Sequence, residues 1–274
     1  MVEFSVAKGK KRPAEADGAP WSFLLALAAG ACALYVFWLP DVRPLKSHPP
    51  KTTAYIELRK AQAAAKGKKL AIVWVWTPYD RIAVPMREAA VMSEDGAFWQ
   101  HGGVDWSALR EAVQVNLAKR RFAYGGSTIT QQLARNLYLS PSKNPLRKIK
   151  EALIAWRLEK ALGKRRILEL YLNVAEWGPG VFGCEAAARR YYGKPAAELL
   201  YEEAASLAAV LPSPRKWHPV RRSKRVERRV QRILARLKAV GKIPESALET
   251  PEERAEPDDS VERPDDGVID GVID

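Results

Sequence analysis

The stretch GGSTITQQLARNLYL, residues 125–139, indicates the fold class of this chain. Its two glycines permit a turn, and Ser127 can cap a helix that follows. Apolar residues recur at helical spacing on one face of this helix: Ile129, Leu133 and Leu137. The opposite face carries a polar stripe: Thr128, Gln132 and Arg135. Such a stripe either looks into a cleft or is a solvated face, and the stretch alone does not decide between them.

Helical patterns also dominate the sequence on both sides of this stretch. Asp105 can cap a helix whose apolar residues recur every four positions: Leu109, Val113 and Leu117. Pro145 suits the first turn of another helix, which is expected to run to about Leu162 and end at Gly163. Further helices are expected near 164–173, 184–192, 201–211 and 223–240. The apolar run LAIVWVW, residues 70–76, predicts a buried strand, so the expected fold is mostly α with a short β element.

Three more motifs in the sequence carry chemically useful groups. EDGAFWQHGGVD, residues 94–105, places two adjacent carboxylates before a Phe, a His and a double glycine. RKIKE, residues 147–151, brings Arg147 and Lys148 within one helical turn of Glu151. ILELYLN, residues 167–173, opens the stretch that continues to residue 194. Taken singly, these motifs are weak evidence for a functional site. Acidic pairs commonly end solvated helices, and i,i+4 ion pairs occur on many surface helices.

The charge balance points to a polyanionic partner. The chain has 45 Lys and Arg against 32 Asp and Glu, a net charge of +13. Residues 246–274 hold 11 acidic and 2 basic residues, so the preceding 245 carry a net charge of +22. Nucleic acid, an anionic membrane and a phosphorylated substrate all fit this excess. The two cysteines, Cys32 and Cys184, argue against a disulfide framework.

Residues 215–242 form the most basic segment, and apolar residues recur in it at helical spacing. This pattern predicts an amphipathic basic helix. Three interpretations stay open: a solvated face, contact with anionic lipid headgroups, and contact with nucleic acid.

Residues 21–39, WSFLLALAAGACALYVFWL, contain no charged side chain. At about 1.5 Å per residue a helix of this length covers roughly the hydrocarbon thickness of a bilayer. A signal peptide is the alternative, but its apolar part usually ends sooner. We therefore expect a retained transmembrane helix, preceded by a cytoplasmic tail at 1–20 and followed by a linker and membrane-proximal segment at 40–69. A globular domain at 70–245 and an acidic disordered tail at 246–274 complete the predicted organisation.

In their order and spacing, the four motifs resemble those of the peptidoglycan glycosyltransferases of family 51, the biosynthetic transglycosylases. The resemblance covers about residues 74–214 and is closest to the monofunctional members. It implies a lysozyme-like, mostly α domain behind one N-terminal transmembrane helix, in the bacterial inner membrane with the catalytic domain in the periplasm. The implied reaction polymerises lipid II into linear glycan strands. The lipid-linked growing chain passes with inversion to the 4-hydroxyl of the acceptor sugar, and undecaprenyl diphosphate is released.

The resemblance also implies roles for individual residues. Glu94 matches the catalytic base, and Glu151 matches the second glutamate, which assists departure of the pyrophosphate. The positions that match substrate-binding residues of the family are Asp95, Phe98, His101, Thr128, Gln132, Arg135, Asn136, Lys143, Arg147 and Lys148. Where this sequence has Arg135 and Lys143, the family usually has Lys and Arg, so the two cations are exchanged. We expect both to bind phosphate still, with altered contacts.

The sequence requires no cofactor, although the family leaves open a divalent cation, Mg²⁺ or Mn²⁺, at the pyrophosphate with Glu151 as its protein ligand. The expected partners are lipid II, the growing glycan chain, the inner membrane and other cell wall synthesis or division proteins, and nucleic acid is not expected. A lysozyme-like peptidoglycan hydrolase is the alternative function. Processivity, strand length, metal dependence, oligomeric state and the role of the acidic tail do not follow from the sequence.

Overall fold

The computed structural model describes residues 19–118, 126–142 and 144–244. The predicted tails and Lys143 therefore lie wholly or largely outside the described residues. The α-helices are α1 Ala19–Phe37, α2 Ala54–Ala64, α3 Val84–Glu94, α4 Trp106–Ala118, α5 Ile129–Tyr138, α6 Pro145–Ala161, α7 Lys164–Val174, α8 Cys184–Tyr192, α9 Tyr201–Val210 and α10 Lys224–Ala239. The strands β1 Val73–Trp74, β2 Glu176–Gly178 and β3 Val181–Phe182 form one sheet in the order β1-β3-β2. The mostly helical fold with a small sheet is confirmed and is consistent with a lysozyme-like domain.

The helix predictions from residue 105 onward are confirmed, with one correction at α5. The N-cap of α5 is Thr128 rather than Ser127, since the Thr128 hydroxyl accepts the Gln131 N–H and the Gln131 side chain returns a hydrogen bond. Ser127 instead accepts a hydrogen bond from the Lys148 ammonium, at 2.7 Å. Asn144 caps α6 by accepting the Leu146 N–H, and Ser223 caps α10 by accepting the Val226 N–H.

Helix α2 and the hairpin of β2 and β3 were not predicted. Helix α2 falls within the stretch expected to be a linker, where Thr53 caps it and Ile56 is buried. The prediction of a buried strand at residues 70–76 was wrong in length and in burial, since β1 has only two residues, of which Val73 is exposed and Trp74 half-buried. Gly183, between β3 and α8, has φ +83°, and an added Cβ would lie 2.9 Å from the Asn173 carbonyl oxygen. A side chain there would push the sheet away from α7.

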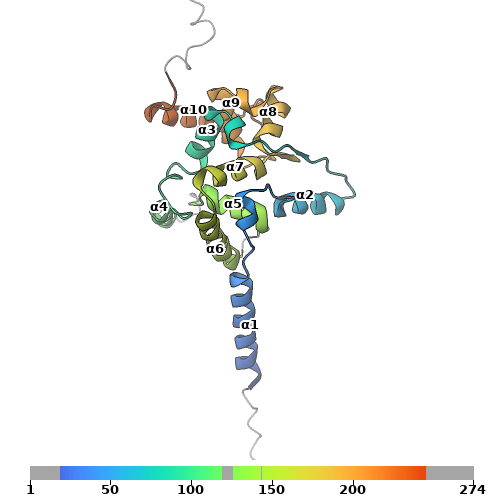
Figure 1. The fold of residues 1–274 in the computed structure, drawn as a ribbon. Coiled ribbons are helices and arrows are strands. Elements are labelled where there is room, and N and C mark those ends of the chain that lie inside the picture. The colour runs from blue at the N-terminus through green and yellow to red at the C-terminus, as the bar shows by residue number, and fades with distance from the viewer. Residues whose placement is uncertain (1–18, 119–125, 143, 245–274) are drawn as a thin grey trace, which may run out of the picture.

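Helix α7 lies at the centre of the body (Figure 1), and all of its apolar side chains are buried: Ile167, Leu168, Leu170, Tyr171, Leu172 and Val174. On one side of it pack α5 and α6, and the predicted apolar face of α5 is buried there. On the other side lie α3, α9 and α10. The other sequence motifs therefore lie on two groups of helices that pack on either side of α7, which carries the motif at residues 167–173.

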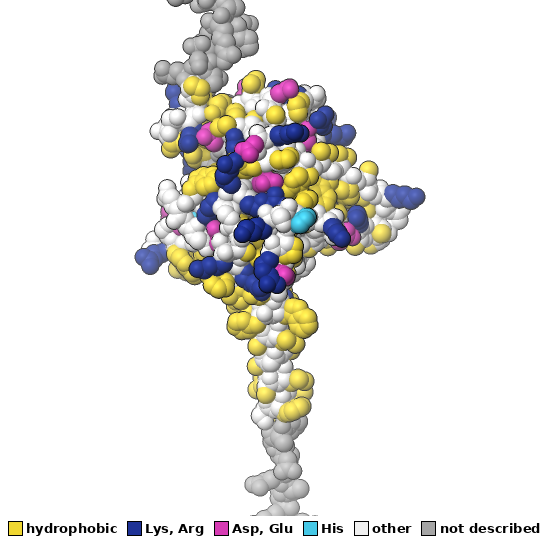
Figure 2. Space-filling view, viewed as in Figure 1, with side chains coloured by type: hydrophobic (Ala, Val, Ile, Leu, Met, Phe, Trp, Pro, Cys, Tyr) yellow, Lys and Arg dark blue, Asp and Glu magenta, His cyan; other side chains and the backbone are white. Residues whose placement is uncertain are grey.

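Helix α1 extends from the body as a stalk whose apolar side chains are mostly exposed (Figures 1 and 2). Its C-terminal end contacts α6, where the Lys150 ammonium lies 4.3 Å from the centre of the Tyr35 ring. No helix in the described part of the chain is long and apolar enough to cross a membrane. The apolar stripe predicted on α4, Leu109, Val113 and Leu117, is also exposed, as is Trp106 at the start of this helix.

Asn173, the penultimate residue of α7, joins this helix to the segment after β1. Its amide oxygen accepts the Thr77 N–H at 2.7 Å, and its amide nitrogen donates to the Thr77 and Glu169 carbonyl oxygens, each at 2.8 Å. Both Asn173 and Thr77 are buried. Water therefore cannot easily replace these hydrogen bonds.

Replacing Asn173 by Ala is expected to lower the free energy of unfolding by about 2–4 kcal/mol, because buried backbone groups of Thr77 lose their partners. Thermal and denaturant unfolding of the detergent-solubilised chain measures the change. Gln114→Ala removes an exposed amide from α4 and should stay within about 0.5 kcal/mol of the wild type. Equal stability of the two variants would contradict the role given to Asn173.

Candidate active site

Glu94 is the last residue of α3, and both of its carboxylate oxygens are held by hydrogen-bond donors. The Gln132 amide donates to Oε2 at 3.0 Å, and the Ser93 hydroxyl donates to Oε1 at 3.0 Å. The side chain is about one tenth exposed. A carboxylate fixed in this way keeps open directions for accepting one more proton.

Gln132 is itself oriented by Tyr171 from α7. The Tyr171 hydroxyl donates to the Gln132 amide oxygen at 3.2 Å, which turns the amide nitrogen toward Glu94. Burial, and next the charge of Glu94, raise the pKa of Tyr171 well above its usual range. The phenol therefore stays protonated and remains a donor.

Asp95 connects the loop after Glu94 to the start of α5. Its Oδ2 accepts the Ile129 N–H at 2.9 Å, and its Oδ1 lies 2.9 Å from His101 Nε2. His101 Nδ1 accepts the Gly103 N–H at 3.2 Å, so the ring proton sits on Nε2 and is donated to Asp95. The Thr128 hydroxyl also donates to the Gly103 carbonyl oxygen at 2.6 Å. The loop and the helix are thereby fixed to each other.

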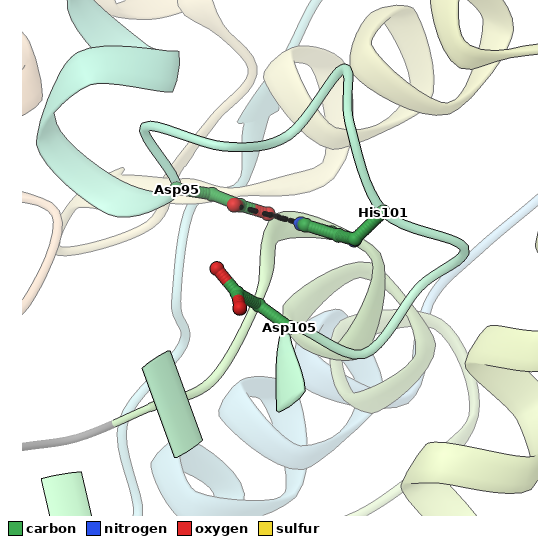
Figure 3. A group of neighbouring side chains, drawn as sticks. All are labelled: Asp95, His101 and Asp105. Carbon is green, nitrogen blue, oxygen red and sulfur yellow. Dashed lines mark hydrogen bonds and ion pairs between the residues drawn. The ribbon is translucent and has the colours of Figure 1, made fainter. Parts of the chain in front are cut away.

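Asp95, His101 and Asp105 form the one group among the described residues whose ligand atoms lie close enough to hold a metal ion (Figure 3). The figure shows His101 pointing at Asp95, with Asp105 beside them. Both ring nitrogens of His101 are already used, and Asp105 caps α4 through the Ala108 N–H at 2.9 Å. The hydrogen bond from Ser107, followed by that of Ala108, lowers the pKa of Asp105. The group is satisfied as a hydrogen-bond network without a metal.

Glu151 lies in α6 and is completely buried among cations. The Arg147 guanidinium contacts its Oε2, the Lys148 ammonium contacts its Oε1, and Arg135 Nη1 lies 4.0 Å from Oε2. Three positive charges thus surround one negative charge. The Arg135 Nε is buried and has no hydrogen-bond partner among the described residues, while a quarter of the side chain remains exposed.

Helix α5 links the two glutamates, because Gln132 contacts Glu94 and Arg135, about one turn later, faces Glu151. The predicted polar stripe therefore looks into the site. Next to Glu94 lies a cavity of about 310 Å³ whose lining combines acidic groups, the turn before α5 and one arginine of α10: Glu94, Asp95, Asp105, Ser127, Thr128 and Arg236.

The predicted site residues are not equally accessible. Phe98 is buried in the core, Thr128 is the buried cap of α5, and Asn136 is buried as well. Their contact with substrate stays a prediction. The exchange of Arg135 and Lys143 cannot be compared, since Lys143 lies outside the described residues.

Sequence reasoning missed Ser93, Tyr171 and Arg229, which contact Glu94 or its neighbour Gln132. Tyr171 belongs to one of the four motifs, ILELYLN, but was assigned no role. Arg229 stood in the basic segment, where it looked like any other charge of an amphipathic helix.

The chain is similar to known proteins over most of its described length. Residues 66–238 match the model of a protein family described as Transglycosylase. A protein of Aromatoleum aromaticum named biosynthetic peptidoglycan transglycosylase is 48% identical over 185 residues, which are 67% of this chain and 80% of that protein. The protein of the same name from Thiobacillus denitrificans is 44% identical over 214 residues, 77% of this chain and 92% of that protein.

The family match covers all four motifs and the helices that carry them. The matches to the two relatives extend over most of the length of those proteins. The chain therefore belongs to the transglycosylase family.

Proposed function

We propose that this chain is a peptidoglycan glycosyltransferase of cell wall synthesis that polymerises lipid II, with Glu94 as its base. Glu94 takes the proton of the acceptor 4-hydroxyl while that oxygen forms a bond to C1 of the lipid-linked donor chain. The bond from C1 to the pyrophosphate oxygen breaks, the anomeric centre inverts, and undecaprenyl diphosphate leaves. The observation that supports this most is that one helix, α5, contacts both an oriented carboxylate, through Gln132, and a separate cationic group, through Arg135.

The cations around Glu151 suit the leaving group. Negative charge grows on the pyrophosphate as its bond to C1 breaks, and fixed donors aimed at that charge lower the barrier. Arg147 and Lys148 are held by Glu151, and Arg135 keeps an unpaired Nε. We assign Glu151 the role of holding these cations in place.

A hydrolase is less consistent with this geometry. Glycosidases of that kind use one carboxylic acid to protonate the leaving oxygen and a second carboxylate on the opposite side of the bond. Here both oxygens of Glu151 face cations, so Glu151 is poorly placed to deliver a proton.

The surroundings of Glu151 do not allow its carboxylate to bind a divalent metal directly. A metal ion would have to displace Arg147 and Lys148 from the two oxygens and would lie close to Arg135. Three fixed positive charges would repel it. The proposed reaction therefore has no step that uses a metal.

We further propose that the uncharged segment 21–39, which continues two residues beyond the end of α1, anchors the chain in the bacterial inner membrane by a single span, with the domain on the periplasmic side. Support comes from the uncharged sequence of residues 21–39 and from the exposed apolar side chains of α1. The exposed stripe of α4 and the exposed Ile149 and Trp156 of α6 add apolar surface on the body.

Glu94→Gln is expected to reduce polymerisation of lipid II by about 10²–10⁴-fold, because the amide cannot take the proton. Gel separation of glycan strands made from labelled lipid II measures the rate. Glu88→Gln is the control, since Glu88 lies on the same helix and pairs with Lys242 at 3.2 Å. Polymerisation by the Glu94 variant within tenfold of the wild type would exclude Glu94 as the base.

Arg135→Ala should lower kcat/KM for lipid II by about 10²–10³-fold, since a preorganised donor to the pyrophosphate is lost. The exposed arginine of α8 gives the control Arg190→Ala, which should be near wild type. An unchanged kcat/KM for the Arg135 variant would show that this cation does not contact the leaving group.

The full chain is expected to remain in the membrane pellet after extraction with alkaline carbonate. A variant lacking residues 1–39 should move largely to the supernatant under the same treatment, because it loses the apolar span. Release of the full chain by carbonate would argue against a spanning anchor.

A further inference from the structure

One arginine of the basic helix α10, Arg229, lies directly beside the Glu94 carboxylate. The exposed basic residues of this helix are Lys224, Arg225, Arg228, Arg232, Arg236 and Lys238. Arg229 differs from them, because its side chain is only 27% exposed. Burial lowers the pKa of Arg229, although a guanidinium remains charged under ordinary conditions.

Arg229 contacts three parts of the structure, namely the end of α3, α9 and Trp217. Its Nη2 donates to the Ser93 hydroxyl at 3.2 Å and lies 3.6 Å from Glu94 Oε1. Its Nε donates to the Ala209 carbonyl oxygen at 3.1 Å. The Trp217 ring lies on another side, 6.0 Å from the guanidinium carbon.

These contacts complete a frame around the Glu94 carboxylate. Gln132, oriented by Tyr171, holds Oε2, whereas Ser93 and Arg229 hold the Oε1 side. A partly buried arginine stabilises its setting only if its charge is compensated, and Glu94 is the carboxylate beside it. The Ala209 carbonyl fixes the guanidinium so that it cannot simply swing into solvent.

We propose that Arg229 is a positioning residue for the base, which holds the Glu94 carboxylate toward the acceptor hydroxyl. This role rests on the proposed function of Glu94. Arg229 acts through Glu94, so its effect belongs to the chemical step and not to substrate binding. The exposed arginines of the same helix have no such contact with the base among the described residues.

The test compares Arg229→Gln with Arg232→Gln, which removes the same charge from an exposed position of the same helix. In steady-state polymerisation of lipid II, Arg229→Gln is expected to lower kcat by about 10- to 100-fold with KM within about twofold. Arg232→Gln should leave kcat within about twofold. Arg229→Lys keeps a cation near Glu94 and should recover kcat to within about fivefold of the wild type.

Two results would overturn the proposal. One is an unchanged kcat for Arg229→Gln, or a change in KM alone that Arg232→Gln reproduces. The other is an equal loss of kcat for the Gln and Lys variants, which would indicate that Arg229 serves only to pack α10 against α9.

A second measurement, the Tm of Arg229→Lys, depends neither on activity nor on whether Arg229→Gln folds. Arg229→Lys should lower the Tm more in the wild type than in a Glu94→Gln background, because the pair it weakens is absent there. Equal shifts in the two backgrounds would contradict a contact between Arg229 and Glu94. Activity of Glu94→Gln near wild type would refute the base itself, whereas an inactive Glu94→Gln beside a fully active Arg229→Gln would exclude only the role of Arg229.

Discussion

The hydrogen bonds of the Asp95 carboxylate determine how the parts of the site are placed. One oxygen accepts the Ile129 N–H at the first turn of α5, and the other accepts the proton of His101. Each such bond to a charged group contributes about 1.5–3 kcal/mol, and the positive end of the helix dipole favours a carboxylate there. Because Asp95 directly follows Glu94, the end of α3 and the start of α5 cannot shift independently.

This constraint passes along α5 to both functional groups. With the helix start fixed, Gln132 reaches Glu94 and Arg135, three residues later, reaches Glu151. The distance between the two groups is then set by the rise of one rigid helix. The opposite face of α5 packs against the core, which prevents rotation of the stripe away from the site. Position along the helix and rotation about it are therefore determined by different sets of residues.

Much of this arrangement could be predicted from local patterns. The helices from residue 105 onward follow from apolar spacing and from capping residues, and the stripe on α5 follows from the same period. The cap itself was misplaced by one residue, because Ser127 and Thr128 are both good caps and only the Thr128 contact with Gly103 distinguishes them. The exposed stripe of α4 shows the opposite limit, since apolar spacing predicts a helix without saying what covers it.

Tyr171 and Arg229 could not have been assigned in this way. Tyr171 reads as one more apolar position of α7, and only its hydroxyl, within reach of Gln132, separates it from a core Phe. Arg229 lies 135 positions from Glu94 in the sequence, and its burial depends on the packing of α10 against α3 and α9. A charge pattern gives the faces of a helix but not which charge at the border between faces turns inward.

The arrangement of the helices also bears on which polyanion the positive charge serves. In Figure 1, α6 lies next to α1, whereas α3 and α10 lie toward the other end of the body. Lys150, beside Glu151 in sequence, contacts Tyr35 of α1, so the cationic group lies near the proposed anchor. A substrate with its lipid in the membrane and its pyrophosphate at the surface would meet these cations first and present its sugars toward Glu94. The exposed face of α10 is then remote from that surface, which argues against its contact with lipid headgroups.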